Sequence, residues 1–191
     1  MPSRRTGSTT STSPPRPSVS ATCLAEPVQA ALYPDGRLVL GGRSFRAALG
    51  RGGIRRDKQE GDGATPVGLL RLIRLLYRAD RLRPPATALP REPIASDDGW
   101  CDDPAHADYN RAIRLPHPAR HEALWREDGV YDLLAVLDWN AGPVRAGRGS
   151  AIFLHLARAD YAPTEGCVAL AEADLRRVLE AGLSAIDVVA G

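Results

Sequence analysis

Residues 149–170, GSAIFLHLARADYAPTEGCVAL, place a histidine and a cysteine on two apolar runs that one loop connects. The first run, residues 151–156, predicts a buried strand with His155 near its end. A corner at residues 164–167 then leads into a second short run at 168–170. We therefore expect the loop to return the Cys167 thiol towards the His155 imidazole.

This pair could perform nucleophilic chemistry. A thiol becomes a strong nucleophile when a neighbouring base favours the thiolate, and imidazole can accept that proton near neutral pH. Gly166 suits a tight corner, which leaves the N–H groups of Gly166 and Cys167 free to face an oxyanion. In a second interpretation, Cys167 is a buried apolar thiol and His155 a hydrogen-bonded strand histidine. For a lone Cys and a lone His, we would prefer the second interpretation.

The stretch resembles the catalytic motif of YkuD-type L,D-transpeptidase domains, in which Ser/Thr-His-Gly-Cys follows a strand histidine after a variable loop. The residues that match this pattern are His155, Thr164, Gly166 and Cys167. Two positions differ, because Glu165 stands where a second histidine is usual and Ala169 stands where Arg or Asn is frequent. The resemblance implies a catalytic centre of Cys167, His155 and Gly166.

A second stretch, residues 58–68 (KQEGDGATPVG), is similar to the Lys-x-Glu-Gly-Asp-Gly-x-Thr-Pro-x-Gly signature of the same family. A long loop this rich in Gly and charge inside a compact domain is typically functional. The resemblance implies that the loop borders the substrate cleft or braces the sheet. Residues 98–111 are similar to a segment of a bacterial subgroup of these domains, which flanks the active-site entrance.

The resemblance implies a reaction on peptidoglycan stem peptides. Cys167 would attack the carbonyl of the third, diamino residue while His155 moves the proton, which releases D-alanine from a thioacyl-enzyme. An amine acceptor makes the protein an L,D-transpeptidase, and water makes it an L,D-carboxypeptidase that trims recycled muropeptides from tetrapeptide to tripeptide. A third hypothesis is a catalytically silent peptidoglycan-binding or scaffold domain. The candidate substrate-binding residues are Thr164, Glu165, Arg158, Lys58 and Tyr109.

We expect Glu165 to point away from the sulfur, because a nearby unpaired carboxylate would raise the pKa of the cysteine. Its charge would then face an arginine such as Arg158, or the amino group of the substrate's diamino residue. Alternatively, Glu165 is a solvated loop residue with no role.

The remaining chain predicts a mainly β domain, a sandwich or partly closed barrel, with one helix after Cys167. Asp35-Gly36 and the next Gly pair predict hairpins. Leu, Val and Leu at helical spacing predict an amphipathic helix over 172–181 with Gly182 as its cap, and residues 118–127 predict a short helical turn. The expected strands cover residues 28–33, 37–40, 44–49, 69–77, 130–137, 151–156, 168–170 and 185–190.

The composition indicates how many domains the chain forms and which kinds of partner it can bind. The chain has 191 residues, 43% of them hydrophobic, which suits one domain with a sizeable core. The net charge of +2 hides an excess of Arg and Lys before residue 96 and of Asp and Glu after it. These charges are scattered, so they do not favour nucleic-acid binding. The expected partner is a peptidoglycan stem peptide or muropeptide.

The first 27 residues are rich in Ser, Thr, Pro and Arg, which predicts a disordered tail before a catalytic domain over 28–191. No apolar region follows Arg4-Arg5, and Cys23 lacks the apolar stretch of a lipoprotein signal. The sequence also predicts no membrane insertion. The expected location is the cytoplasm, or the periplasm if a misplaced start codon has removed a signal.

The cysteines, histidines and aspartates match no disulfide or metal-binding pattern. Three widely spaced cysteines suggest no disulfide framework. A zinc set of Cys101, His106, His155 and Cys167 has no standard ligand spacing, and a calcium set at Asp97, Asp98, Asp102 and Asp103 lacks the EF-hand spacing. We therefore expect neither a metal nor a cofactor.

Overall fold

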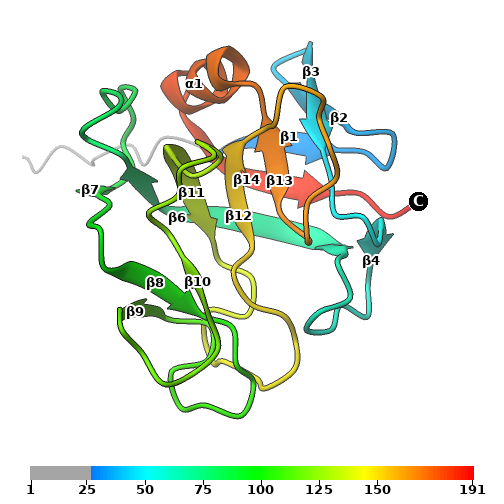
Figure 1. Ribbon diagram of the computed structural model, residues 1–191. Coiled ribbons are helices and arrows are strands. Elements are labelled where there is room, and N and C mark those ends of the chain that lie inside the picture. Colours follow the sequence, from blue (N-terminus) through cyan, green and yellow to red (C-terminus); the bar gives the residue numbers. More distant parts are fainter. Residues whose placement is uncertain (1–26) are drawn as a thin grey trace, which may run out of the picture.

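The structure, a computed structural model, describes residues 27–191. The predicted tail, with Cys23, lies almost entirely outside the described residues. A nine-stranded sheet has the order β11-β12-β13-β3-β2-β1-β14-β6-β7, and an additional β11–β6 pairing closes it into a barrel-like ring (Figure 1). This confirms the mainly β prediction. The strands of this sheet are β1 (Val28–Leu32), β2 (Arg37–Leu40), β3 (Arg43–Ala48), β6 (Gly68–Tyr77), β7 (Arg91–Pro93), β11 (Leu133–Leu137), β12 (Phe153–Leu156), β13 (Val168–Leu170) and β14 (Leu183–Val188).

The first three strands form the predicted antiparallel hairpins, with β2 paired to both β1 and β3. The first turn places Gly36 at φ +80°, and a Cβ there would lie 2.7 Å from the Ala47 carbonyl oxygen, so this position requires glycine. β1 also pairs in parallel with β14, which joins the two ends of the domain.

Helix α1 (Glu172–Glu180) follows β13, as predicted, and contacts β14 and β12 (Figure 1). Its apolar stripe of Leu175, Val178 and Leu179 is completely buried in the main core. Each such aliphatic side chain stabilises the fold by roughly 1.5–3 kcal/mol. Gly182, at φ +87°, follows the last turn as the predicted C-terminal glycine. No helix in residues 27–191 has the length and hydrophobicity of a membrane span.

Smaller strands lie in the loops beside the barrel: β4 (Ile54–Arg55) pairs with β5 (Thr65–Pro66), and β8 (Asp98–Cys101) lies between β9 (Ala112–Arg114) and β10 (His121–Ala123). The helical turn predicted over 118–127 is wrong, because β10 occupies this segment. Glu122 pairs with Trp100 of β8, so tertiary pairing overrides the local helical pattern.

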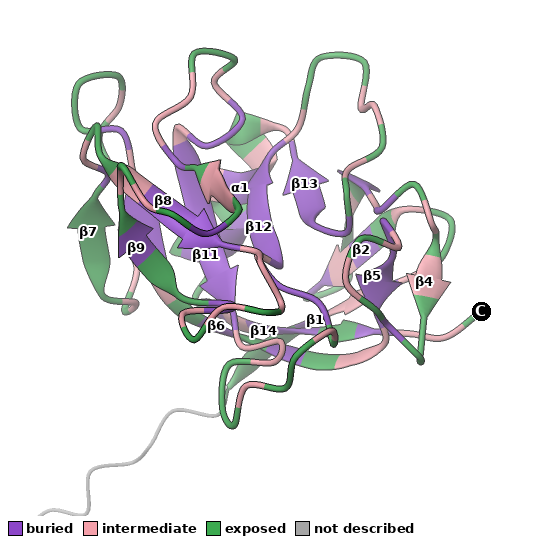
Figure 2. Ribbon diagram, turned by 60° about the horizontal axis from the view of Figure 1, so that its bottom comes forward, coloured by how far each residue is buried: buried purple, intermediate pink, exposed green. Residues whose placement is uncertain are grey.

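A second apolar cluster packs where β11 and β12 meet the loops. The Phe153 ring contacts Trp100 and Tyr131 edge to face, at centroid distances of 5.1 and 5.8 Å. Figure 2 shows β11, β12 and β13 buried along their lengths. β12, which carries His155, and β13, which directly follows Cys167, therefore belong to the buried centre of the molecule.

Candidate active site

His155 and Cys167 come together through two neighbouring strands. β12 and β13 run parallel, with His155 opposite Ala169. Alternate residues of a strand face the same side of a sheet, so His155, Ala169 and Cys167 share one face. All three line a cavity of about 320 Å³. The predicted return of the thiol towards the imidazole is thus a consequence of strand register.

The cavity wall is mixed and mostly polar, with acidic, basic and apolar groups from several loops. Its lining residues are Glu60, Asp102, Glu122, Arg126, Val130, Tyr131, Ser150, Ala151, His155, Arg158, Ala162, Pro163, Thr164, Glu165, Cys167 and Ala169. The predicted residues Thr164, Glu165 and Arg158 are therefore brought to the same cavity as the catalytic pair.

The His155 ring is held in one orientation. Its Nδ1 lies 2.9 Å from the Leu156 carbonyl oxygen, which can only accept, so Nδ1 carries the proton and Nε2 keeps its lone pair. The Tyr131 ring packs against it at a centroid distance of 5.2 Å. Burial lowers the pKa of His155 to about 4, so the ring is neutral near pH 7. A neutral imidazole with a free Nε2 is competent to act as a base.

The Cys167 sulfur is held by two backbone groups. It donates its S–H to the Ala151 carbonyl oxygen at 3.2 Å and accepts the Phe153 N–H at 3.4 Å. Burial, and then the negative charge of Glu122, raise the pKa of Cys167 to about 12. Cysteine and histidine are therefore both neutral in the unliganded protein, rather than a thiolate–imidazolium pair.

The corner before Cys167 is fixed by Thr164 and Gly166. The Thr164 hydroxyl donates to the Cys167 carbonyl oxygen at 2.7 Å and accepts the Gly166 N–H at 3.2 Å. The expectation that the Gly166 N–H is free is therefore wrong, because Thr164 occupies it. In residues 27–191, the Cys167 N–H has no hydrogen-bond acceptor. Gly166 has φ +130°, and a Cβ there would lie 2.8 Å from the Ala64 carbonyl oxygen, so a side chain is excluded.

Glu165 and Arg158 do not pair with each other. Glu165 is 75% exposed and forms an ion pair with Arg51 at 2.8 Å, while Arg158 lies 3.4 Å from Asp128. Glu165 does face an arginine, as predicted, but this arginine is Arg51 and not Arg158, which pairs with Asp128 instead. The Glu165 side chain is held at the rim of the cavity by a surface ion pair.

Lys58 and Tyr109 lie behind the cavity wall. Lys58 is 2% exposed, and its Nζ contacts Asp62 at 2.5 Å and the Gln59 carbonyl oxygen at 2.7 Å. Tyr109 is equally buried; its hydroxyl donates to Glu60 at 2.5 Å and accepts the Gly149 N–H at 3.0 Å. Neither side chain lines the cavity. Their polar atoms brace the loops at 58–68 and 149–151 in this structure.

Asn110 is a positioning residue that sequence reasoning missed. Its Oδ1 accepts the Trp100 indole N–H at 3.0 Å and the Ala151 N–H at 3.1 Å. Its Nδ2 donates to two carbonyl oxygens, at 3.1 Å and 2.9 Å. These bonds hold Ala151 at φ +52°, an uncommon conformation for a residue with a side chain, with its carbonyl oxygen towards the thiol. The sequence showed only an Asn in an aromatic loop.

Four residues between 122 and 131 form a network that the sequence did not predict. Tyr131 donates its hydroxyl to Glu122 at 2.7 Å. Arg126 binds Asp128 through two hydrogen bonds of 2.9 and 2.7 Å, and its guanidinium lies 5.2 Å from the Tyr131 ring centroid. The pairing lowers the pKa of Asp128 to about 2, whereas burial raises the pKa of Glu122. These residues lie on a three-residue strand and the loop that follows it, which is too short a strand to show a periodicity in the sequence.

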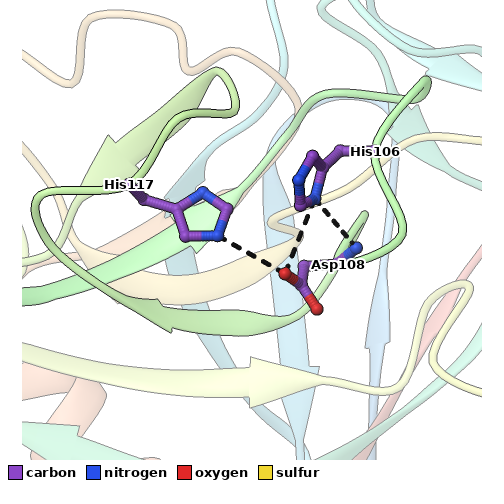
Figure 3. A group of neighbouring side chains, drawn as sticks. All are labelled: His106, Asp108 and His117. Atoms are coloured by element: carbon purple, nitrogen blue, oxygen red, sulfur yellow. Dashed lines mark hydrogen bonds and ion pairs between the residues drawn. The ribbon is translucent and has the colours of Figure 1, made fainter.

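A histidine–carboxylate cluster is formed by the loops that flank β9. Asp108 Oδ2 is 3.5 Å from His106 Nδ1 and 3.4 Å from His117 Nε2 (Figure 3). Among residues 27–191, this is the one group with metal-like spacing. Each Nδ1 already accepts a backbone N–H, from Asp108 and Ala119 respectively. The zinc set considered from the sequence is not assembled, since Cys101 and Cys167 lie in different apolar clusters.

Comparison with known proteins identifies the family of this domain. The chain matched no curated protein. Two similar solved structures are L,D-transpeptidase 1 of Mycobacterium tuberculosis (14% identity, TM-score 0.38, covering 86% of this chain and 62% of that one) and the L,D-transpeptidase LdtMt1 in complex with imipenem (13% identity, TM-score 0.36, covering 85% and 58%). The chain thus spans less than two thirds of their length. A family model of the L,D-transpeptidase catalytic domain matches residues 24–185, so the chain belongs to the YkuD family.

Proposed function

We propose that this protein is a cysteine-dependent acyl transferase that acts on peptidoglycan stem peptides. One observation carries the proposal: in a YkuD domain, Cys167 and a neutral His155 share one face of two paired strands and line one cavity. The cavity, about 320 Å³, is large enough for several atoms of a peptide around its reacting carbonyl. Cys167 is the nucleophile and His155 the base.

Acylation would proceed in two steps. Cys167 Sγ bonds to the carbonyl carbon of the third residue as His155 Nε2 accepts the thiol proton, and the Cys167 N–H stabilises the oxyanion. The tetrahedral intermediate then collapses, the carbon–nitrogen bond to D-alanine breaks, and the imidazolium returns the proton to the leaving amine. The products are a thioester on Cys167 and free D-alanine.

The electrostatics of the pair indicate when the proton moves. Because the pKa of the thiol is raised and that of the imidazole is lowered, a separated ion pair is unfavourable before substrate binds. Proton transfer would therefore accompany attack on the carbonyl, as with a hydroxyl nucleophile. The fixed Nδ1–H, bonded to the Leu156 carbonyl oxygen, stabilises the imidazolium that forms.

The acceptor decides between the two activities. An amine would regenerate the enzyme by transpeptidation, whereas water would give the tripeptide, as in a carboxypeptidase of muropeptide recycling. Both share the thioester, so product analysis separates them. Cytoplasmic residence, which cell fractionation can measure, would support the recycling role, and periplasmic residence would support cross-linking.

The test is trapping of the thioester. Intact-mass spectrometry of the protein with a tetrapeptide, or with a carbapenem, should show an adduct that peptide mapping assigns to Cys167. Cys167→Ala should give no adduct and no turnover. Cys101→Ser changes a buried thiol of a separate apolar cluster and is the matched control. It should keep both the adduct and the turnover. A wild-type protein that stays unmodified while Cys167 still reacts with a thiol reagent would overturn the assignment and revive the scaffold hypothesis.

A further inference from the structure

Four carboxylates line the cavity, and three of them are well compensated. Glu165 pairs with Arg51 at 2.8 Å, and Asp102 pairs with Arg120 at 3.0 Å. Glu60 accepts two hydroxyl hydrogen bonds of 2.5 and 2.7 Å on its Oε2, and its Oε1 lies 4.0 Å from Arg120. Two of these groups are therefore ion-paired, and the third has two hydrogen-bond donors.

Among the four carboxylates of the cavity, Glu122 has the fewest partners. Its Oε1 accepts one hydrogen bond, from Tyr131. The nearest guanidinium, Arg126, is 3.7 Å away and already binds Asp128 through two hydrogen bonds. Within residues 27–191, Glu122 Oε2 has no hydrogen-bond donor. Burial and the charges of Asp102 and Asp128 raise the pKa of Glu122, which agrees with a carboxylate that lacks a full counter-charge.

We propose that Glu122 binds a primary ammonium group of the substrate inside the active-site cavity. The inference rests on the proposed function, since a diamino residue of a stem peptide supplies such an ammonium close to its reacting carbonyl. An ammonium is compact and donates three hydrogen bonds, so it can use the free Oε2 without displacing Arg126 from Asp128. Glu122 is therefore a specificity residue, and Glu165, on its surface ion pair, is not.

This subsite also connects recognition to reactivity. Glu122 faces the nucleophile closely enough for its charge to raise the pKa of Cys167, whereas Lys58 and the Phe153 N–H act in the opposite direction. Tyr131, which interacts with both groups, is itself held neutral by burial. An ammonium bound to Glu122 would cancel the opposing charge and favour proton loss from the thiol. Peptides with the free amine would bind more tightly and react faster.

The binding test uses Cys167→Ala, which cannot be acylated, and two tetrapeptides that differ only by acetylation of the side-chain amine of residue three. Calorimetry should show that the free amine binds about tenfold more tightly or better, as expected for a hydrogen bond to a charged group. Adding Glu122→Gln should abolish this preference while keeping the acceptor for Tyr131. The matched control Glu127→Gln, 83% exposed and paired with Arg81 outside the cavity, should keep it. An unchanged preference with Glu122→Gln, or no preference at all, overturns the inference.

Alkylation by iodoacetamide gives a readout that needs no peptide turnover. In the otherwise native chain, Glu122→Gln should speed alkylation of Cys167, mapped by peptide mass, by about three- to tenfold. Glu127→Gln should not change it. A protein that forms no peptide adduct but shows the amine preference loses the proposed function and keeps the subsite. A protein that turns over the peptide but shows no preference for the free amine keeps the proposed function and loses the subsite.

Discussion

Glu165 and Glu122 are two carboxylates of one cavity with opposite environments. Glu165 is two residues from the nucleophile in sequence, yet it is 75% exposed and paired with Arg51. Glu122 is far away in sequence, but its side chain is only 29% exposed, and its charge raises the pKa of Cys167. Solvent therefore screens the charge of Glu165 more strongly than that of Glu122. Burial, and not sequence distance, decides which carboxylate controls the thiol.

Glu122 modulates the thiol, whereas His155 is the base that accepts its proton, so removing His155 should have the largest effect. His155→Ala should lower kcat/KM by about 10³-fold with little change in KM, because it removes general base catalysis. Steady-state release of D-alanine measures this. His121→Ala changes a histidine outside the cavity and should stay within a few-fold of wild type. A loss below tenfold for His155→Ala would mean that another group takes the proton.

The geometry around the sulfur can be loosened without changing any charge. Asn110→Ala should destabilise the protein by about 1–3 kcal/mol, because it leaves buried donors of Trp100 and Ala151 without their acceptor. Denaturant unfolding measures the free energy. Asn110→Asp keeps that acceptor but loses the two donated bonds and places a buried negative charge beside the carbonyl oxygens of Trp139 and Asn140, so it should destabilise the protein as well. Equal stability for all three would show that Asn110 does not hold the loop.

The pH dependence of Cys167 alkylation tests whether the charge of Glu122 raises the pKa of the thiol. With a thiol pKa near 12, the rate at Cys167 should rise about tenfold per pH unit from pH 6 to 9 without a plateau, since only the thiolate reacts. Removing the Glu122 charge stabilises the thiolate, so Glu122→Gln should move the curve to lower pH. A plateau below pH 8 in the wild type would instead reveal a preformed thiolate–imidazolium pair.

The smallest effect is expected at Glu165. Glu165→Gln should change KM and kcat by less than about twofold, because the carboxylate is solvated and its ion pair with Arg51 lies at the surface. Peptide kinetics at two salt concentrations provide the measurement. A marked rise in KM would restore Glu165 as a substrate-binding residue, and a marked gain in kcat would show that its charge does reach the sulfur.

Sequence reasoning succeeded where local pattern and strand register determine the outcome. The hairpins, the helix after Cys167 and the mainly β class follow from periodicity and turn residues, and β12 and β13 then fix His155 and Cys167 on one face. Two motif stretches were sufficient to indicate the family.

The cavity wall could not be predicted in the same way. Glu122 lies on β10, a strand that exists only because it pairs with β8, where the local sequence suggested a helical turn. Its effect depends on burial and on the partners of Arg126, which are tertiary properties. The Gly166 N–H was wrongly expected to be free because the bond to Thr164 depends on one side-chain rotamer.

Lys58 has a consequence for amine chemistry. It is the only lysine of the sequence, it is 2% exposed, and its Nζ is bound to Asp62. Residues 27–191 therefore offer no accessible lysine side chain that could discharge a thioester on itself or on a second copy. A lysine of this domain is thus not the acyl acceptor, and the accepting amine must come from elsewhere. For the same reason, an amine-selective dye should leave Lys58 unlabelled in the native protein and label it after denaturation.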